Sequence, residues 1–243
     1  MSSHIYLRML GYVVTITLHV GNIVVMSQPK PKHIVVDPRI AAYAELQARF
    51  FTCWTFFLQI VCAFSGLICD TLVLWNTSNK DYKLPKYLRG FRNTLFSAIV
   101  WPCTWLVFLF FWTLYIYDRS LIYPEFVDDY LTPTSNHIMH TAIIPIVLWE
   151  VVFQPRYIPK SHARNLKHLT FHLVLYFIVM IYTYVERNVW IYPVFKRLYG
   201  TPYFFIVLAS LLLICVIFYY IQWFLTKIIW GRLEKENTKI KIH

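Results

Sequence analysis

Charged residues are scarce in this chain. Lys, Arg, Asp and Glu together make up 14% of its 243 residues, whereas a soluble domain of this size has about a quarter. Hydrophobic residues make up 58%, and the charges cluster between long apolar runs. This pattern excludes an ordinary soluble domain and predicts an all-α polytopic bundle that crosses a bilayer several times.

Paired cysteines are lacking as well. No CxxC occurs, and all five cysteines lie inside apolar runs: Cys53, Cys62, Cys69, Cys103 and Cys215. No spacing among them points to a disulfide framework or a zinc site. We therefore expect small buried hydrophobic side chains, and neither a metal nor a cofactor. A G-x-S-x-G elbow, the usual mark of a serine hydrolase, is also absent,.

Six apolar runs are the main feature that is present. They cover residues 5–26, 46–75, 94–117, 137–153, 168–186 and 202–226, and each reaches or approaches the ~20 residues that a helix needs to cross a membrane. The fourth run is the shortest and contains Pro145, and Pro102 lies inside the third. The whole chain, 1–243, is expected to form one domain of six transmembrane helices.

The distribution of Lys and Arg predicts the orientation. If the N-terminus is cytoplasmic, fifteen of these residues lie on the cytoplasmic side and eight on the other, which favours both termini in the cytoplasm. We expect a multi-pass protein of the endoplasmic reticulum or plasma membrane.

A net charge of +11 suggests nucleic acid in a soluble protein,, but these basic residues lie mostly in short connections, so we expect no nucleic-acid partner. The glycosylation sequon at Asn76 falls on the cytoplasmic side and is interpreted as accidental,.

One short pattern occurs twice. Asp118-Arg119 leads to Ile122-Tyr123-Pro124 and Phe126, and Glu186-Arg187 leads to Ile191-Tyr192-Pro193 and Phe195. Both copies follow odd-numbered spans, so both lie on the same outer side. Interfacial tyrosines and helix-ending prolines explain the likeness about as well as a shared functional role does, and both interpretations stay open.

Polar groups inside the spans are the place to look for function, because they are costly in a bilayer. One helical face of the second span carries Thr52, Thr55 and Gln59, and one face of the fourth carries His137, His140 and Thr141,. Both spans cross in the same direction, and Thr52 and His140 each lie within ~10 Å of the same membrane surface. Their side chains are therefore at similar depth and meet if the helices are neighbours.

A hydroxyl beside an imidazole can perform acyl transfer. The histidine takes the proton, and the alkoxide attacks an ester carbonyl. A threonine in a membrane helix, however, usually bonds its own i−4 carbonyl or packs against another helix. On these residues alone, a structural role for Thr52 and His140 is the commoner outcome.

Several motifs together resemble a known family. They are Phe51-Thr52 with Phe56-Phe57-Leu58-Gln59, Trp112 to Tyr115, Tyr117-Asp118-Arg119, Ile122-Tyr123-Pro124, Asn136-His137, Met139-His140-Thr141, Pro145, and Trp190 with Tyr192-Pro193. In this order they resemble the family of androgen-induced and androgen-dependent TFPI-regulating membrane proteins, over most of the chain. The sequence departs from the family pattern at Cys53-Trp54-Thr55, so Thr55 is an alternative counterpart of the nucleophile.

The resemblance implies a multi-pass membrane hydrolase with a threonine nucleophile, whose family substrates are fatty acid esters of hydroxy fatty acids. It maps the nucleophile to Thr52 and the histidine to His140. We expect a lipid ester taken from the bilayer as the partner. Arg119 or Arg187 is a candidate to pair with a substrate carboxylate, although anchoring of a helix end is the more common role for either arginine alone.

The remaining members of such a site are less defined by the sequence. Asp118 and Glu186 are candidates to orient the imidazole, although salt bridges or solvation explain them more simply. Candidate oxyanion donors are Asn136, His137 and Tyr123.

Two rival functions are open. A bis-histidine haem needs two imidazoles at one depth, and no convincing pair forms among His19, His137, His140, His168 and His172. A non-enzymatic lipid-binding or regulatory protein would use the same apolar groove, with Thr52 and His140 as packing groups. A transporter is disfavoured, because the spans are not obviously broken and intramembrane charges are few.

Overall fold

The structure is all-α, as predicted. The computed structural model describes residues 2–31, 37–79 and 81–240, and the regular elements in these ranges are all helical. Six helical segments there are long and apolar enough to cross a membrane: His4–Met26, Phe51–Trp75, Lys86–Leu121, Pro133–Phe153, Ala163–Arg187 and Pro202–Gly231. The chain is therefore a polytopic bundle of six spans.

The helices follow one another with short connections. In order they are α1 (Ser2–Met26), α3 (Pro38–Glu45), α4 (Phe51–Trp75), α5 (Lys86–Thr94), α6 (Trp101–Asp118), α7 (Val127–Tyr130), α8 (Pro133–His140), α9 (Ile143–Phe153), α10 (Ala163–Arg187), α11 (Pro193–Leu198) and α12 (Pro202–Ile240). Two 3-10 turns, Gln47–Arg49 and Arg119–Leu121, precede α4 and follow α6, and a π-helical segment, Leu95–Val100, joins α5 to α6.

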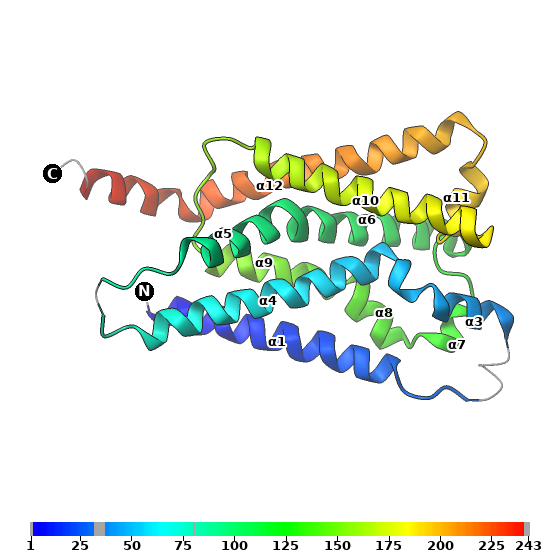
Figure 1. The fold of residues 1–243 in the computed structure, drawn as a ribbon, viewed down its shortest axis with the longest axis horizontal. Helices are drawn as coiled ribbons and strands as arrows, with labels where there is room; N and C mark the ends of the chain where they lie inside the picture. Colours follow the sequence, from blue (N-terminus) through cyan, green and yellow to red (C-terminus); the bar gives the residue numbers. More distant parts are fainter. Residues whose placement is uncertain (1, 32–36, 80, 241–243) are drawn as a thin grey trace.

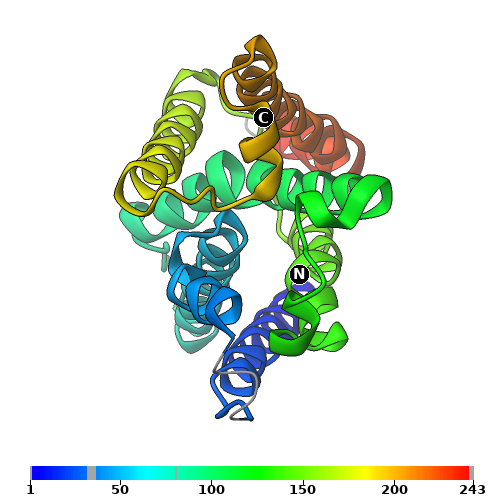
Figure 2. The same ribbon diagram turned by 90° about the vertical axis from the view of Figure 1, so that its right-hand side faces the viewer.

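The third span is the centre of the bundle. Its most apolar window is 67% buried, against at most 39% for any other span. Figures 1 and 2 show α6 between α10 and α12 on one side and α1, α4 and α9 on the other. Both termini lie at the same end of the bundle (Figure 1), which we call the terminal end.

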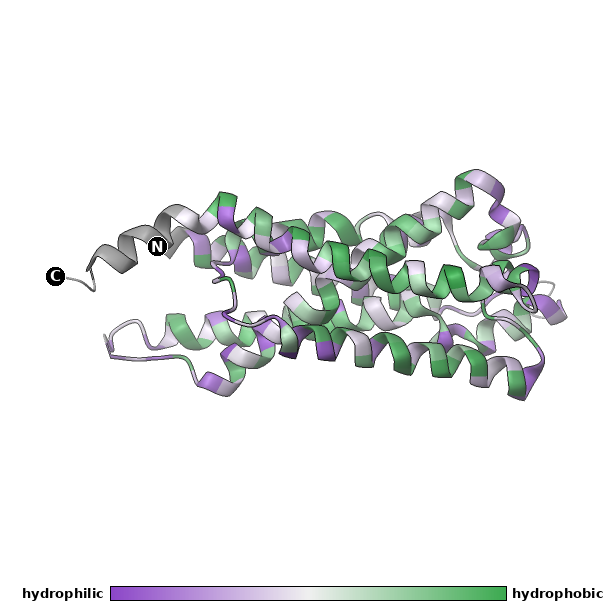
Figure 3. Cartoon of the chain, turned by 90° about the horizontal axis from the view of Figure 1, so that it is seen from above, coloured by the Kyte–Doolittle hydropathy of each residue, from purple (hydrophilic) through white to green (hydrophobic). Residues whose placement is uncertain are grey.

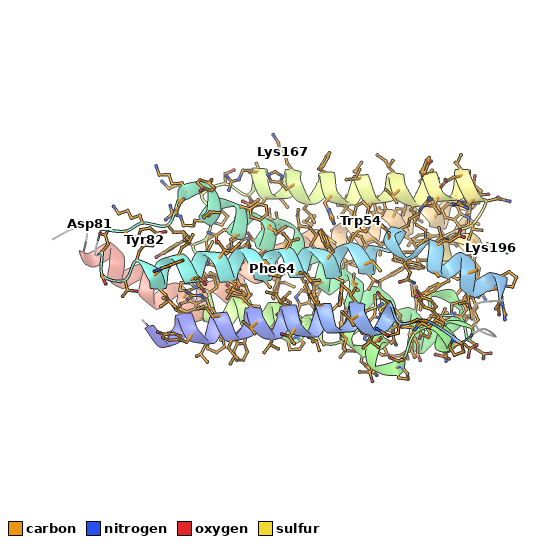
Figure 4. All side chains as sticks on the ribbon, turned by 60° about the horizontal axis from the view of Figure 1, so that its bottom comes forward. Trp54, Phe64, Asp81, Tyr82, Lys167 and Lys196 are labelled. Atoms are coloured by element: carbon orange, nitrogen blue, oxygen red, sulfur yellow. The ribbon has the colours of Figure 1, made fainter. Side chains whose placement is uncertain are left out.

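Polar residues gather toward the two ends. Hydrophobic residues follow the long helices, and hydrophilic ones are concentrated near the connections (Figure 3). Asp81 lies at the terminal end and Lys196 at the opposite end (Figure 4). The bundle is thus built as an apolar band between two polar margins, as a spanning protein requires.

The predicted start of the second span, residue 46, is wrong. Residues 47–49 form a 3-10 turn and Phe50 is extended, with φ −72° and ψ 135°, so α4 begins at Phe51. The carbonyl of Phe50 accepts the N–H groups of Cys53 and Trp54, which makes Phe50 the capping residue. Thr52 consequently lies in the first turn of the helix.

The fourth span differs from the prediction at its start and in its continuity. It begins at Pro133, where the Thr132 hydroxyl caps α8 by accepting the Ser135 N–H at 3.1 Å. It breaks after His140, and α9 resumes at Ile143. Pro145 explains the break, because its ring clashes with the carbonyl four residues earlier and it has no N–H to donate.

Three of the other predicted spans are too short. The helical segment of the third span runs from Lys86 to Leu121, α10 begins at Ala163, and α12 continues to Ile240. Polar turns extend these helices beyond the apolar windows, which alone set the predicted limits.

Two buried carboxylates tie the terminal end together. Asp70 of α4 accepts from Arg8 of α1 at 2.7 and 2.9 Å and from Arg92 of α5 at 3.3 Å. Asp70 is only 2% exposed, and both arginines are buried. Removing one partner of such a group leaves an uncompensated buried charge, which costs about 3–5 kcal/mol.

The second carboxylate is Glu150 of α9. It accepts the Tyr12 hydroxyl at 2.7 Å and the Arg156 guanidinium at 2.8 Å, and Arg156 also lies over the Phe96 ring, 3.6 Å from its centroid. Three arginines on the side predicted to be cytoplasmic are thus buried in ion pairs: Arg8, Arg92 and Arg156. They fix the packing of the helices and also contribute to the excess of Lys and Arg on that side.

Replacing Asp70 should destabilise the fold. Asp70→Ala leaves Arg8 and Arg92 buried without their carboxylate, so we expect about 3–5 kcal/mol less stability and a clearly lower thermal unfolding midpoint in detergent. Asp81→Ala, at an exposed position of the connection between α4 and α5, is the matched control. Equal midpoints for the two variants would show that the buried pair does not stabilise the bundle.

Candidate active site

A small apolar cavity lies at the end of the bundle opposite the termini. It has a volume of about 60 Å³ and is enclosed by α4, α6, α8, α10 and α12 with the connections that follow α3, α6 and α10. Most of its wall is aromatic or aliphatic. The polar side chains that line it are Tyr43, Gln47, Thr52, Cys53, Tyr123, His140, Tyr176 and Tyr192. Lys and Arg are missing from its lining residues.

Thr52 and His140 meet at this cavity. Thr52, in the first turn of α4, and His140, the last residue of α8, bring Oγ1 and Nε2 to 3.4 Å. Thr52 is half-buried and His140 is 6% exposed. A separation of this size is long for a hydrogen bond, as catalytic contacts often are before a substrate binds.

Asn136 and Phe111 hold the His140 ring in place. His140 Nδ1 lies 3.0 Å from the Asn136 carbonyl oxygen and 2.8 Å from Asn136 Oδ1. Both are acceptors, so Nδ1 carries the proton and Nε2 presents a free lone pair to Thr52. The ring also stacks on Phe111, with centroids 3.6 Å apart and planes 11° from parallel. The histidine is therefore oriented as a base.

Two tyrosines fix the start of α4. The Phe51 N–H donates to the hydroxyls of Tyr192 at 3.0 Å and Tyr176 at 3.1 Å. An N–H in the first turn has no partner within its own helix, so these hydroxyls decide where the helix begins. They thereby set the position of Thr52, the next residue.

The repeated Ile-Tyr-Pro pattern supplies two tyrosines of the cavity wall. Tyr123 and Tyr192 are buried and both line the cavity. The Tyr123 hydroxyl lies 3.4 Å from the Leu131 carbonyl. The two copies, separated by the fourth and fifth spans, thus contribute one tyrosine each to the same cavity.

Thr55, the alternative to Thr52, lies away from His140. It is 1% exposed, is not part of the cavity wall, and its hydroxyl has no hydrogen-bond partner among the described residues. The third polar residue of that face, Gln59, bonds His19 and Thr104, each at 2.8 Å. Of the face predicted from sequence, the structure therefore brings only Thr52 to the imidazole.

His137 points away from the cavity. It is exposed, contacts Thr141 Oγ1 through Nδ1 at 3.1 Å, and stacks on Trp112. Asn136 lies behind His140, where its oxygen accepts from the ring. Of the three expected oxyanion donors, only Tyr123 reaches the wall.

The predicted carboxylate-binding arginines lie outside the cavity. Arg119 donates to the Tyr123 carbonyl at 3.2 Å and to Asp128 at 2.6 Å. Arg187 is half-exposed and lies 3.7 Å from Glu45. Neither residue lines the cavity.

The predicted orienting carboxylates are bound elsewhere too. Asp118 accepts from Ser120 and pairs with Arg197 at 3.4 Å. Glu186 pairs with Arg49. The residue that orients His140 is instead Asn136, one helical turn earlier in the same helix.

Sequence reasoning missed Tyr176, Tyr192 and Gln47 as site residues. The Ile-Tyr-Pro repeat was a usable signal for Tyr192. Tyr176 is one of eighteen tyrosines, and nothing in its neighbourhood distinguishes it. Among the described residues, no group of three His, Cys, Asp or Glu side chains could hold a metal ion.

Comparison with known proteins gives the family. The family model described as FAR-17a/AIG1-like protein matches residues 12–227. The human androgen-dependent TFPI-regulating protein is 37% identical over 163 residues, 67% of this chain and 68% of that protein. The mouse protein of the same name is 36% identical, over 63% and 64%. The human androgen-induced gene 1 protein is 26% identical, over 75% and 76%.

No solved structure matches the chain. The family match covers most of the sequence and includes Thr52, Asn136, His140 and both Ile-Tyr-Pro copies. The chain belongs to the FAR-17a/AIG1-like family.

Proposed function

We propose that this protein is a membrane-embedded lipid ester hydrolase in which Thr52 is the nucleophile and His140 the base. The contact that carries the proposal is the 3.4 Å approach of Thr52 Oγ1 to His140 Nε2 at an apolar cavity. The orientation of the ring by Asn136 supports it, because a nucleophile, a base and a group that orients the base form the usual hydrolytic unit.

The proposed cycle has two halves. Thr52 gives its proton to His140 Nε2 as its oxygen attacks the ester carbonyl, and His140 returns the proton to the departing alcohol. Water, activated by the same imidazole, then hydrolyses the acyl-threonine. Asn136 keeps Nδ1 protonated throughout, so the ring becomes an imidazolium without turning.

The lining suits an ester with long hydrocarbon chains. The wall is apolar and the site lies near one end of the spans, so chains can extend into the bilayer while the ester stays close to the membrane surface. We propose fatty acid esters of hydroxy fatty acids as substrates. Because the lining residues include no cation, the free carboxylate of such a substrate stays outside the cavity, where Arg119 and Arg187 are the candidate partners.

Substrate binding requires the wall to move. A cavity of ~150 Å³ holds one benzene ring, and this one has only about 60 Å³. An acyl chain therefore enters only when side chains such as Phe177 or Phe110 swing aside, or when the surrounding helices separate.

We propose the orientation that the Lys and Arg distribution favours, with both termini in the cytoplasm of an endoplasmic reticulum or plasma membrane. The catalytic pair then faces the lumen or the exterior. A non-enzymatic lipid-binding or regulatory role is the alternative, and the following measurements separate the two.

Thr52→Ala and His140→Ala should each abolish ester hydrolysis. Each removes one of the two groups that exchange the proton, and the measurement is hydrolysis of a panel of branched fatty acid esters by purified protein in detergent. Thr55→Ala, one helical turn away and outside the cavity, is the matched control and should retain wild-type turnover. Full activity of Thr52→Ala would rule out the assignment, and an inactive but ester-binding wild type would favour the non-enzymatic role.

Glycosylation mapping should confirm the orientation. The natural sequon at Asn76 lies in the connection after α4 at the terminal end, so it should stay unmodified in cells. A sequon introduced into the connection between α10 and α11 should be glycosylated, because that end faces the lumen in the proposed orientation. The reverse pattern would place the catalytic pair on the cytoplasmic side.

A further inference from the structure

Acyl transfer at Thr52 needs hydrogen-bond donors for the oxygen that becomes negative. Preorganised donors of this kind usually supply the largest share of the stabilisation of such a transition state. Two polar side chains on the cavity wall can each turn a donor hydrogen toward such an oxygen,. One is the hydroxyl of Tyr192 and the other is the carboxamide of Gln47.

The Tyr192 hydroxyl keeps its own hydrogen free of Phe51 and Tyr176. Its oxygen accepts the Phe51 N–H at 3.0 Å and the Tyr176 hydroxyl at 3.4 Å, which occupies both lone pairs. Its own hydrogen is therefore the one directed toward Thr52, beside which the side chain lines the cavity. Burial raises the pKa of Tyr192 to about 12, against the opposing contacts with Tyr176, Phe51 and Thr52. The phenol thus keeps its proton at neutral pH.

Gln47 offers an unpaired amide. Its Nε2 is buried and has no hydrogen-bond partner among the described residues, while Oε1 accepts weakly from Cys53 Sγ at 3.9 Å. The Tyr43 hydroxyl lies beside the carboxamide, and because an amide nitrogen carries two hydrogens, one is available to another acceptor even so. A buried donor left without an acceptor is costly and uncommon, so an acceptor from a bound molecule would complete it.

The two donors flank the nucleophile. Tyr192 contacts Phe51, the residue before Thr52, and Gln47 contacts Cys53, the residue after it. Both belong to the same cavity wall as Thr52 and His140. We propose that the Tyr192 hydroxyl and the Gln47 carboxamide form the oxyanion site of the hydrolase.

The assignment rests on the proposed function and adds two catalytic residues to it. As the bond from Thr52 Oγ1 to the carbonyl carbon forms, the C=O π pair moves onto the carbonyl oxygen, and the Thr52 proton passes to His140 Nε2. Tyr192 and Gln47 donate to that oxygen. When the electron pair on this oxygen re-forms the C=O bond, the ester C–O bond breaks. The alcohol then leaves with the proton from His140. Water repeats the steps on the acyl-threonine.

Tyr192→Phe and Gln47→Met test the site, because each removes a donor and keeps most of the side-chain volume. Loss of one oxyanion donor lowers kcat by about 10²–10³-fold, and we expect this loss with little change in KM. Tyr176→Phe is the comparison, since it removes the other hydroxyl on the Phe51 N–H but no donor to the oxyanion. Its loss of kcat should be at least ~10-fold smaller.

The outcomes separate this inference from the hydrolase itself. If Thr52→Ala keeps full activity, the hydrolase proposal fails. If Thr52→Ala is inactive while Tyr192→Phe and Gln47→Met keep wild-type kcat, only the oxyanion site is overturned. A rise in KM alone, or equal losses in Tyr192→Phe and Tyr176→Phe, would show a binding or positioning role and overturn it too. If Tyr192→Phe fails to fold, Gln47→Met decides by the same kcat criterion.

Discussion

The proposed chemistry depends on a single contact between two spans, from the Thr52 hydroxyl to the His140 imidazole. α4 starts at Phe51 because two tyrosine hydroxyls take its first N–H, and α8 stops at His140 because Pro145 prevents the helix from continuing,. A helix start and a helix break therefore place the pair, and the tight packing around α6 holds it there.

Much of the fold could be predicted from the sequence, since six apolar runs separated by polar segments leave few alternatives to a six-span bundle. The start of α4 could not, because it depends on side chains distant in sequence. Phe51 is capped by tyrosines more than a hundred residues away. The shared depth of Thr52 and His140 followed from two spans crossing in the same direction, and that inference needed no tertiary information.

The sequence did not identify the other groups around Thr52 and His140, and the reason is electrostatic. Arg119 and Arg187 looked available for a carboxylate, but Asp128 and Glu45 lie beside them in the fold. Asp118 and Glu186 were candidates to orient the histidine, with salt bridges as the simpler explanation, and Arg197 and Arg49 do pair with them. Charged groups near a membrane surface find partners of opposite sign, and the sequence does not show which. The imidazole is oriented instead by a neutral amide one turn away, whose distance is fixed by helical geometry.

The most direct test of the central claim is to find the residue that carries a covalent adduct. Wild-type protein is treated with a lipid-like fluorophosphonate and digested, and the modified peptide is sequenced by mass spectrometry. A phosphonyl group on Thr52, lost when His140 is replaced by Ala, is the result that the contact between these two residues predicts. An adduct on another side chain, or labelling of Thr52 that does not depend on His140, would contradict it.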